Sequence, residues 1–238
     1  MFKKILCFLI VYALLVPTAL QAEEQKVMTF STVQGSALGL VSADILREAY
    51  RRNGMQIKVL EVPAKRGLHN ANLGIYDGEV MRIAGIPKAY PNLITVPHFV
   101  NVMEGVAFSK NKQIQIQGWA SLKPYKIGVV RGMKFAENGT VGMDRDLVNN
   151  PVQLFKMLNR GRLDIVVLSR MSSLGALKVS GVKGVYVLSP PLVKINLYHY
   201  LHKKHKDLVP QISKTLEELE KEGVIQKIRE RHIARLSQ

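Results

Sequence analysis

Residues 151–168, PVQLFKMLNRGRLDIVVL, place an amphipathic helix directly before a buried strand. The helix is predicted over residues 151–159, where apolar residues recur at helical spacing, and the strand over residues 164–168. Another strand-like run, KIGVV, precedes them at residues 126–130. Because strand, helix and strand alternate, this part of the chain is predicted to form a mostly parallel sheet with helices on its faces.

The same alternation occurs once earlier in the chain, and the polar residues 109–117 (SKNKQIQIQ) separate the two parts. Strands are predicted at residues 27–32, 57–62, 80–84, 102–108, 184–188 and 197–201, and helices at residues 42–53, 66–72, 171–178, 208–222 and 224–236. Two similar α/β halves with a helical tail predict a bilobed protein. A ligand is expected where loops at the carboxyl ends of strands from both lobes meet.

The N-terminus has the three parts of an export signal. Lys3 and Lys4 are basic, residues 5–16 are almost wholly apolar, and PTALQA at residues 17–22 ends in small residues. We expect cleavage after Ala22 and a mature chain in the periplasm. The apolar run is shorter than the roughly 20 residues that span a bilayer, so an uncleaved anchor is the less favoured alternative. Cys7 lies within this segment, and the mature chain is expected to contain no thiol or disulfide.

The chain is strongly basic. Its formal net charge is +16, and +14 remains once Lys3 and Lys4 leave with the signal. Such a surplus favours an acidic ligand, an anionic membrane surface or nucleic acid as a partner, although a solvated, generally basic surface is the preferred explanation. No zinc finger, helix-turn-helix or RNA-binding aromatic motif is present in the sequence, so nucleic acid is not expected as a partner.

Three stretches carry a resemblance to a known family. They are LKPYKIGVVRG at residues 122–132, LNRGRLDIVV at residues 158–167 and LEELEKEGVIQKI at residues 216–228. In this order they resemble elements of the periplasmic solute-binding proteins of the amino-acid-transporter type, bacterial extracellular solute-binding family 3. The resemblance implies the type II periplasmic-binding-protein fold, two α/β lobes joined by two crossover strands around a ligand cleft. Lobe 1 is then expected at residues 23–108 and 195–238, and lobe 2 at residues 109–194.

A narrower resemblance lies in the first half. PAKR at residues 63–66, NLGIYDGEVMRI at residues 72–83 and YPNLITVP at residues 90–97 are similar to motifs of an exported subgroup whose ligand the resemblance does not supply. Two departures from the amino-acid binders concern the ligand. The family's arginine-bearing TxxR element falls on IPKAY at residues 86–90, and the family's aspartate for the ligand amino group falls on Ser169. A standard α-amino acid is therefore not expected.

Six residues are candidate ligand contacts: Arg66, Arg82, Arg131, Gly132, Ser169 and Arg170. The arginines present planar forks that pair with a carboxylate or phosphate. Gly132 follows a strand and precedes a short helix, where backbone N–H groups can bind an anion, although the glycine can equally serve the turn alone. For Arg82 the alternative is an ion pair with Asp77 or Glu79 that only holds the lobe together.

His199, His202 and His205 form an HxxHxxH run that could suggest a metal site. If the predicted strand at residues 197–201 continues through His202, then His199 and His202 point to opposite faces and cannot share an ion. No metal and no cofactor is therefore predicted.

Three functions are compatible with the sequence. The first is a periplasmic binding protein, expected as a monomer, that captures a small and possibly anionic solute and presents it to an ABC-type transporter or to a membrane sensor. The second is an enzyme, which is disfavoured because no catalytic constellation is recognisable. The third is a basic protein that binds anionic envelope polymers through its surface.

Overall fold

The computed structural model describes residues 27–237, and the proposed export signal lies outside these residues. The strands are β1 (Val27–Val33), β2 (Gln56–Val62), β3 (Gly78–Arg82), β4 (Leu93–Ser109), β5 (Ile127–Val130), β6 (Arg145–Val148), β7 (Ile165–Ser169), β8 (Tyr186–Val187) and β9 (Val193–His202). The α-helices are α1 (Ala37–Arg52), α2 (Ala64–Asn72), α3 (Lys134–Gly139), α4 (Pro151–Asn159), α5 (Arg170–Ser180), α6 (Val209–Lys221) and α7 (Val224–Ser237). Among these residues, no helix is long and apolar enough to cross a bilayer.

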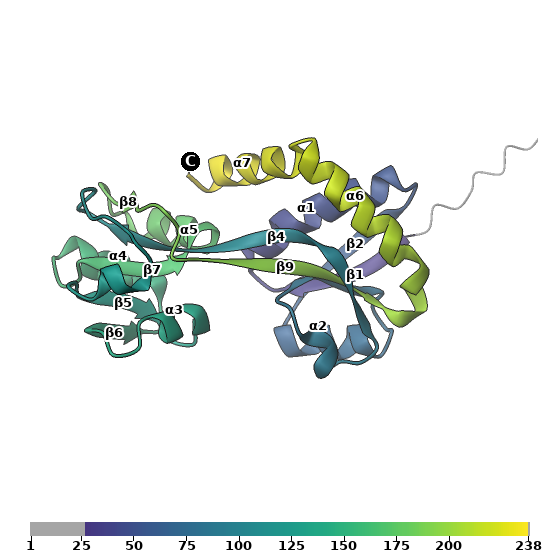
Figure 1. The fold of residues 1–238 in the computed structure, drawn as a ribbon, viewed down its shortest axis with the longest axis horizontal. Helices are drawn as coiled ribbons and strands as arrows, with labels where there is room; N and C mark the ends of the chain where they lie inside the picture. Colours follow the sequence, from purple (N-terminus) through teal and green to yellow (C-terminus); the bar gives the residue numbers. More distant parts are fainter. Residues whose placement is uncertain (1–26, 238) are drawn as a thin grey trace, which may run out of the picture.

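The strands form one continuous sheet in the order β2-β1-β3-β9-β4-β7-β5-β6, with β8 paired to β4. Strands β1, β2 and β3 are parallel, and so are β5, β6 and β7. The long strands β4 and β9 are antiparallel to each other and connect the two parallel groups (Figure 1). The prediction of two α/β lobes joined by two crossover strands is confirmed.

Each lobe has its own core. In the first lobe, apolar residues of α1, β1 and the terminal helices pack together, with Phe30, Ile45 and Leu216 among the fully buried side chains. In the second lobe, two clusters lie around β5 and β7, one containing Ile127 and the other Phe155. Burial of this much apolar surface is the main term that stabilises each lobe.

Strand β4 enters both cores. Val96 and Val100 belong to the core of the first lobe, whereas Val106 and Phe108 belong to a cluster of the second. The lobe division between residues 108 and 109 remains a prediction.

Helix α7 and the start of α5 connect the lobes on one side of β4 and β9. Helix α7 contacts both α1 and α5, and α1 also contacts α5. Met171, the second residue of α5, packs into the core of the first lobe. In Figure 1, helices α1, α5 and α7 lie above the paired strands, and α2 and α3 lie below them.

Several elements differ from the sequence prediction, among them α1, which begins at Ala37 rather than residue 42, and β9, which begins at Val193 rather than residue 197. Strand β4 begins at Leu93, whereas the prediction began at residue 102. Residues 93–101 lack a clear strand pattern because they include Pro97, which has no backbone N–H to donate to a neighbouring strand. The pairing register with β9 also shifts between Thr95 and Phe99. The four-residue strand β6 lies at the end of the strand order and is only half-buried, so it carries no strong apolar signal.

Candidate functional site

The two faces of the connecting strands differ in character. A Cβ built on Gly105 of β4 would lie 2.4 Å from the ring of Phe135, in the first turn of α3. The preceding residue, Glu104, instead pairs with Arg170 at the start of α5, at 2.6 Å. Because neighbouring side chains of a strand alternate, at Glu104 and Gly105 one face of β4 looks toward α5 and the other toward α3.

This alternation separates Ser169 from Arg170. Ser169 of β7 is directly opposite Gly105 of β4, and opposite residues of an antiparallel pair point to the same face. Ser169 therefore belongs to the α3 face. Its side chain is buried, and its Oγ has no hydrogen-bond partner among residues 27–237. A buried hydroxyl without a partner is costly, and Ser169 Oγ has almost no accessible surface, so a ligand reaches it only if neighbouring atoms move.

The loop before α3 holds Arg131 and Gly132. Gly132 has φ +85°, a left-handed conformation that favours glycine, so the turn itself explains this residue. Its backbone N–H donates to the Glu137 carboxylate at 2.7 Å, and this bond is the main reason that the pKa of Glu137 lies below its usual value. The side chain of Arg131 is exposed and donates to the carbonyl of Leu147 at 3.3 Å.

In the first lobe, Arg82 is held by a buried carboxylate. Its guanidinium lies 2.8 Å from Glu79 and also donates to the carbonyl of Ala64, at the start of α2. Glu79 is fully buried and accepts a hydrogen bond from Ser31 at 2.7 Å. Burial raises the pKa of Glu79, although Arg82 and Ser31 oppose this effect. Of the two partners expected for Arg82, the structure selects Glu79.

Arg66 and Asp77 have contrasting environments. Arg66 is exposed on α2, and its side chain has no hydrogen bond or ion pair to any residue in the described range 27–237. Asp77 accepts hydrogen bonds from the Thr29 N–H and from Lys204 and lies 2.6 Å from His205. Its pKa is lowered by these hydrogen bonds, which outweigh the opposing effect of burial. Asp77 therefore connects β1 to the segment that follows β9 within the first lobe.

The three histidines of the HxxHxxH run occupy different environments. His199 is fully buried, where its Nε2 lies 3.0 Å from the Tyr50 hydroxyl and its Nδ1 lies 2.7 Å from the Glu79 carbonyl. His202 is half-buried at the end of β9, and His205 bonds to Asp77. Within residues 27–237, no group of three or more His, Cys, Asp or Glu side chains could hold a metal.

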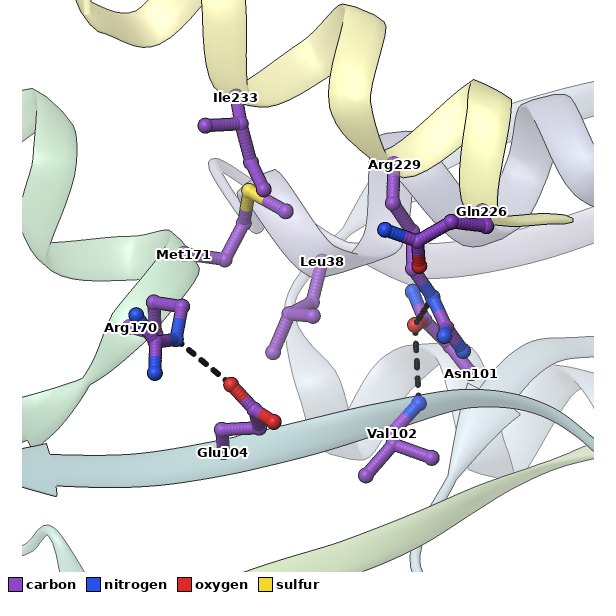
Figure 2. Close-up of a pocket in the computed structure, with 9 residues that line it drawn as sticks. All are labelled: Leu38, Asn101, Val102, Glu104, Arg170, Met171, Gln226, Arg229 and Ile233. Atoms are coloured by element: carbon purple, nitrogen blue, oxygen red, sulfur yellow. Dashed lines mark hydrogen bonds and ion pairs between the residues drawn. The ribbon is translucent and has the colours of Figure 1, made fainter. Parts of the chain in front are cut away.

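A pocket of about 310 Å³ lies on the other face of the connecting strands, between β4 and α7 (Figure 2). Arg170 and Glu104 line it from below, and Arg229 of α7 and Asn101 of β4 line it beside them. Of the six predicted contacts, Arg170 is the one that lines this pocket. The sequence analysis did not find Glu104, Asn101 and Arg229, because they approach one another only through the long strand and the C-terminal helix.

No protein-family model matches the chain. The chain is 26% identical over 198 residues to an uncharacterised protein of Shewanella oneidensis, a match that covers 78% of this chain and 73% of that protein. It is similar in structure to the L-cystine solute receptor of Neisseria gonorrhoeae in the unliganded open conformation, with a TM-score of 0.71 and 16% identity, over 88% of this chain and 94% of the receptor. It also resembles a histidine kinase sensor domain with similarity to periplasmic binding proteins, with a TM-score of 0.59 and 14% identity, over 87% and 96% of the two chains. The chain therefore has the fold of periplasmic solute-binding proteins.

The close approach at Gly105 predicts a specific effect of added volume. In the Gly105→Ala variant, the new methyl group meets Phe135 and also Cγ1 of Val193, 2.7 Å away, and we expect it to destabilise the protein by roughly 1–3 kcal/mol. Gly175→Ala is the matched control, because no atom lies within 4 Å of its added Cβ and alanine favours the helix. Chemical denaturation of both variants measures the difference, and equal stability contradicts the packing at β4.

Proposed function

We propose that the chain is a periplasmic solute-binding protein that takes a small solute between its two lobes and presents it to an ABC-type transporter. The observation that carries this proposal is the joining of two parallel-sheet lobes by β4 and β9, in a fold shared with a solute receptor. Ligands of open α/β sheets bind outside the carboxyl ends of the strands, and here those ends come from both lobes. Binding that satisfies polar groups of both lobes selects the closed arrangement. We propose binding rather than catalysis.

The proposed ligand site is the face of the connecting strands that α2 and α3 share. On this face, Ser169 offers an unpartnered hydroxyl, and Arg66 and Arg131 carry exposed guanidinium groups. The positive charge favours an anionic solute. Ser169 cannot neutralise an ammonium group, whose burial without a counter-charge costs several kcal/mol, so an α-amino acid is disfavoured.

Arg82 and Gly132 contribute to this site mainly by shaping it. Glu79 already occupies the guanidinium of Arg82, and Glu137 occupies the N–H of Gly132. A ligand reaches the Gly132 N–H, or the Nε and Nη2 of Arg82, only by displacing a carboxylate of the protein itself.

A thermal-shift screen tests the proposal. The protein without the proposed signal, residues 23–238, is screened against organic acids, phosphates, amino acids and polyamines. We expect an organic acid or phosphate to raise the melting temperature, because a ligand that binds only the folded state stabilises it by mass action. Arg66→Ala should remove the shift, whereas Lys65→Ala, at a neighbouring residue of the same charge that is also exposed, should retain it. The proposed site is wrong if both variants behave alike, and the proposed function is wrong if no solute produces a shift.

A second candidate partner is a membrane signalling receptor. The structural likeness to a histidine kinase sensor domain favours it, because that domain uses the same fold in a sensor. The two partners predict different phenotypes when the chain is deleted from cells. Loss of solute uptake identifies a transporter, whereas intact uptake with a lost transcriptional response to the solute identifies a sensor.

A further inference from the structure

The pocket between β4 and α7 is built from both lobes and from the strand that joins them. Leu38 at the start of α1 and Arg229 of α7 belong to elements of the first lobe, and Arg170 and Met171 begin α5 of the second. Asn101 and Glu104 line it from β4. Figure 2 shows these side chains converging on a common space, with the apolar Leu38 and Met171 between the two charged groups.

The charges of this pocket do not balance. Arg170 is neutralised by Glu104, which also lies 3.8 Å from Lys194. Arg229 has no such carboxylate in contact, and its Nε donates instead to the amide oxygen of Asn101 at 2.9 Å. That oxygen also accepts from the Val102 N–H, and the Asn101 amide nitrogen donates to Ser42. These hydrogen bonds fix the orientation of the Asn101 amide, which binds the Arg229 guanidinium through a single hydrogen bond.

One nitrogen of this guanidinium is left without a partner. Nη2 of Arg229 is buried and makes no hydrogen bond to any residue from 27 to 237. Burial lowers the pKa of Arg229, which reflects the cost of removing its charge from water. Arginine nevertheless stays protonated, so the pocket is lined by a desolvated cation whose covered Nη2 is an unused donor. A carboxylate both neutralises the charge of Arg229 and accepts hydrogen bonds from its guanidinium.

The remaining wall of the pocket is apolar. Leu38 and Met171 are buried, and Val102 and Ile233 complete the surface beside them. A volume of about 310 Å³ lies at the lower end of the range for ligand pockets, which suits a small molecule. Contact with these side chains favours a hydrocarbon chain over a polar one.

We propose that this pocket binds a small carboxylate with a short hydrocarbon chain, its carboxylate at the guanidinium of Arg229 and its chain against Leu38, Met171 and Ile233. This site is separate from the proposed solute site on the α3 face. A molecule here contacts both lobes and the connecting strand, so its affinity depends on how the lobes are arranged. By linkage, it biases that arrangement in turn and couples the two sites.

Titration calorimetry with hexanoate tests the proposal on residues 23–238. We expect saturable binding to the unaltered protein and at least tenfold weaker binding to Arg229→Gln, because a charge-assisted hydrogen bond is lost. Arg231→Gln, which alters an exposed arginine of the same helix, should bind as the unaltered protein does. Hexan-1-ol and hexylammonium, which keep the chain and lose the negative charge, should bind at least tenfold more weakly than hexanoate.

A second pair of variants does not depend on Arg229. Gln226→Trp fills the pocket from an exposed position of α7 and should block hexanoate, whereas Lys227→Trp, at the adjacent exposed position, should not. Absence of saturable binding at millimolar hexanoate overturns the proposal. So does binding that Arg66→Ala removes and Arg229→Gln leaves intact, because the probe then occupies the α3 face. Neither result bears on the thermal-shift screen, whose solutes are tested separately.

Discussion

Arg82→Ala should destabilise the first lobe by about 3–5 kcal/mol, because it leaves the carboxylate of Glu79 buried and unpaired. Glu79 has no exposed surface, and Ser31 is its one other side-chain partner within residues 27–237. Urea denaturation at pH 7.5 measures the loss. In the double variant Glu79→Gln/Arg82→Ala, the buried charge is absent, so a large part of the stability should return.

The loss of stability in Arg82→Ala should also depend on pH. Removing Arg82 raises the pKa of Glu79 further above its ordinary value of 4.5. A carboxyl with a raised folded-state pKa contributes stability that is fully present below its unfolded-state pKa and is lost as pH rises through the folded-state pKa. The deficit of Arg82→Ala should therefore be smaller at pH 4 than at pH 7.5. Arg51→Ala, which breaks an exposed ion pair with Glu48, should stay close to the unaltered protein at both pH values.

The second large effect concerns His199. Burial lowers the pKa of this histidine from 6.5 to about 4. The hydrogen bond to the Glu79 backbone carbonyl opposes this effect but does not outweigh it. With Nδ1 assigned as the protonated nitrogen, the Tyr50 hydroxyl donates to Nε2 of the neutral ring. Between about pH 6.5 and 4, the His199 side chain is protonated in the unfolded chain but stays neutral in the native state. Stability should therefore fall by about 3 kcal/mol as pH decreases through this window.

His199→Gln isolates this effect. A glutamine amide can still donate to the Glu79 carbonyl and accept from Tyr50, but it does not titrate. Its free energy of unfolding should fall much less than that of the unaltered protein between pH 6.5 and 4, whatever its stability at pH 7. His69→Gln serves as the control, because His69 is exposed on α2 and the steep dependence should persist. Parallel curves for the unaltered protein and His199→Gln contradict the buried neutral histidine.

The fold could be predicted from the sequence because local patterns repeat in the right order. The helix at residues 151–159 has the predicted bounds, and the buried strand after it differs by one residue. Strand β4 was only half predicted, because Pro97 interrupts its first part, before residue 102. Its role as the connection depends on pairing with residues almost 100 positions away, which no local pattern reports.

The candidate site was harder to predict for a similar reason. Arg82 follows an Asp-Gly-Glu turn, and both acids were considered as partners, but burial of Glu79 under α2 decides between them. Ser169 and Arg170 are neighbours in sequence, yet they face opposite sides of the sheet. The sequence predicts that both residues follow the same strand. It does not show which face each side chain occupies, because the chain passes from strand to helix between them.

The connection between the lobes has a mechanical consequence. From Asn101 to Gly105, β4 pairs with β9 in an unbroken register, and the register shifts lie nearer the first lobe. Each residue of this ladder is held by its neighbours, so no single backbone bond is free to act as a pivot. Any reorientation of the lobes has to be distributed as twist along the two-stranded ribbon, with small changes at many dihedral angles. Stiffness is then a property of the whole ribbon, and a substitution at one of its positions should alter the range of motion only slightly.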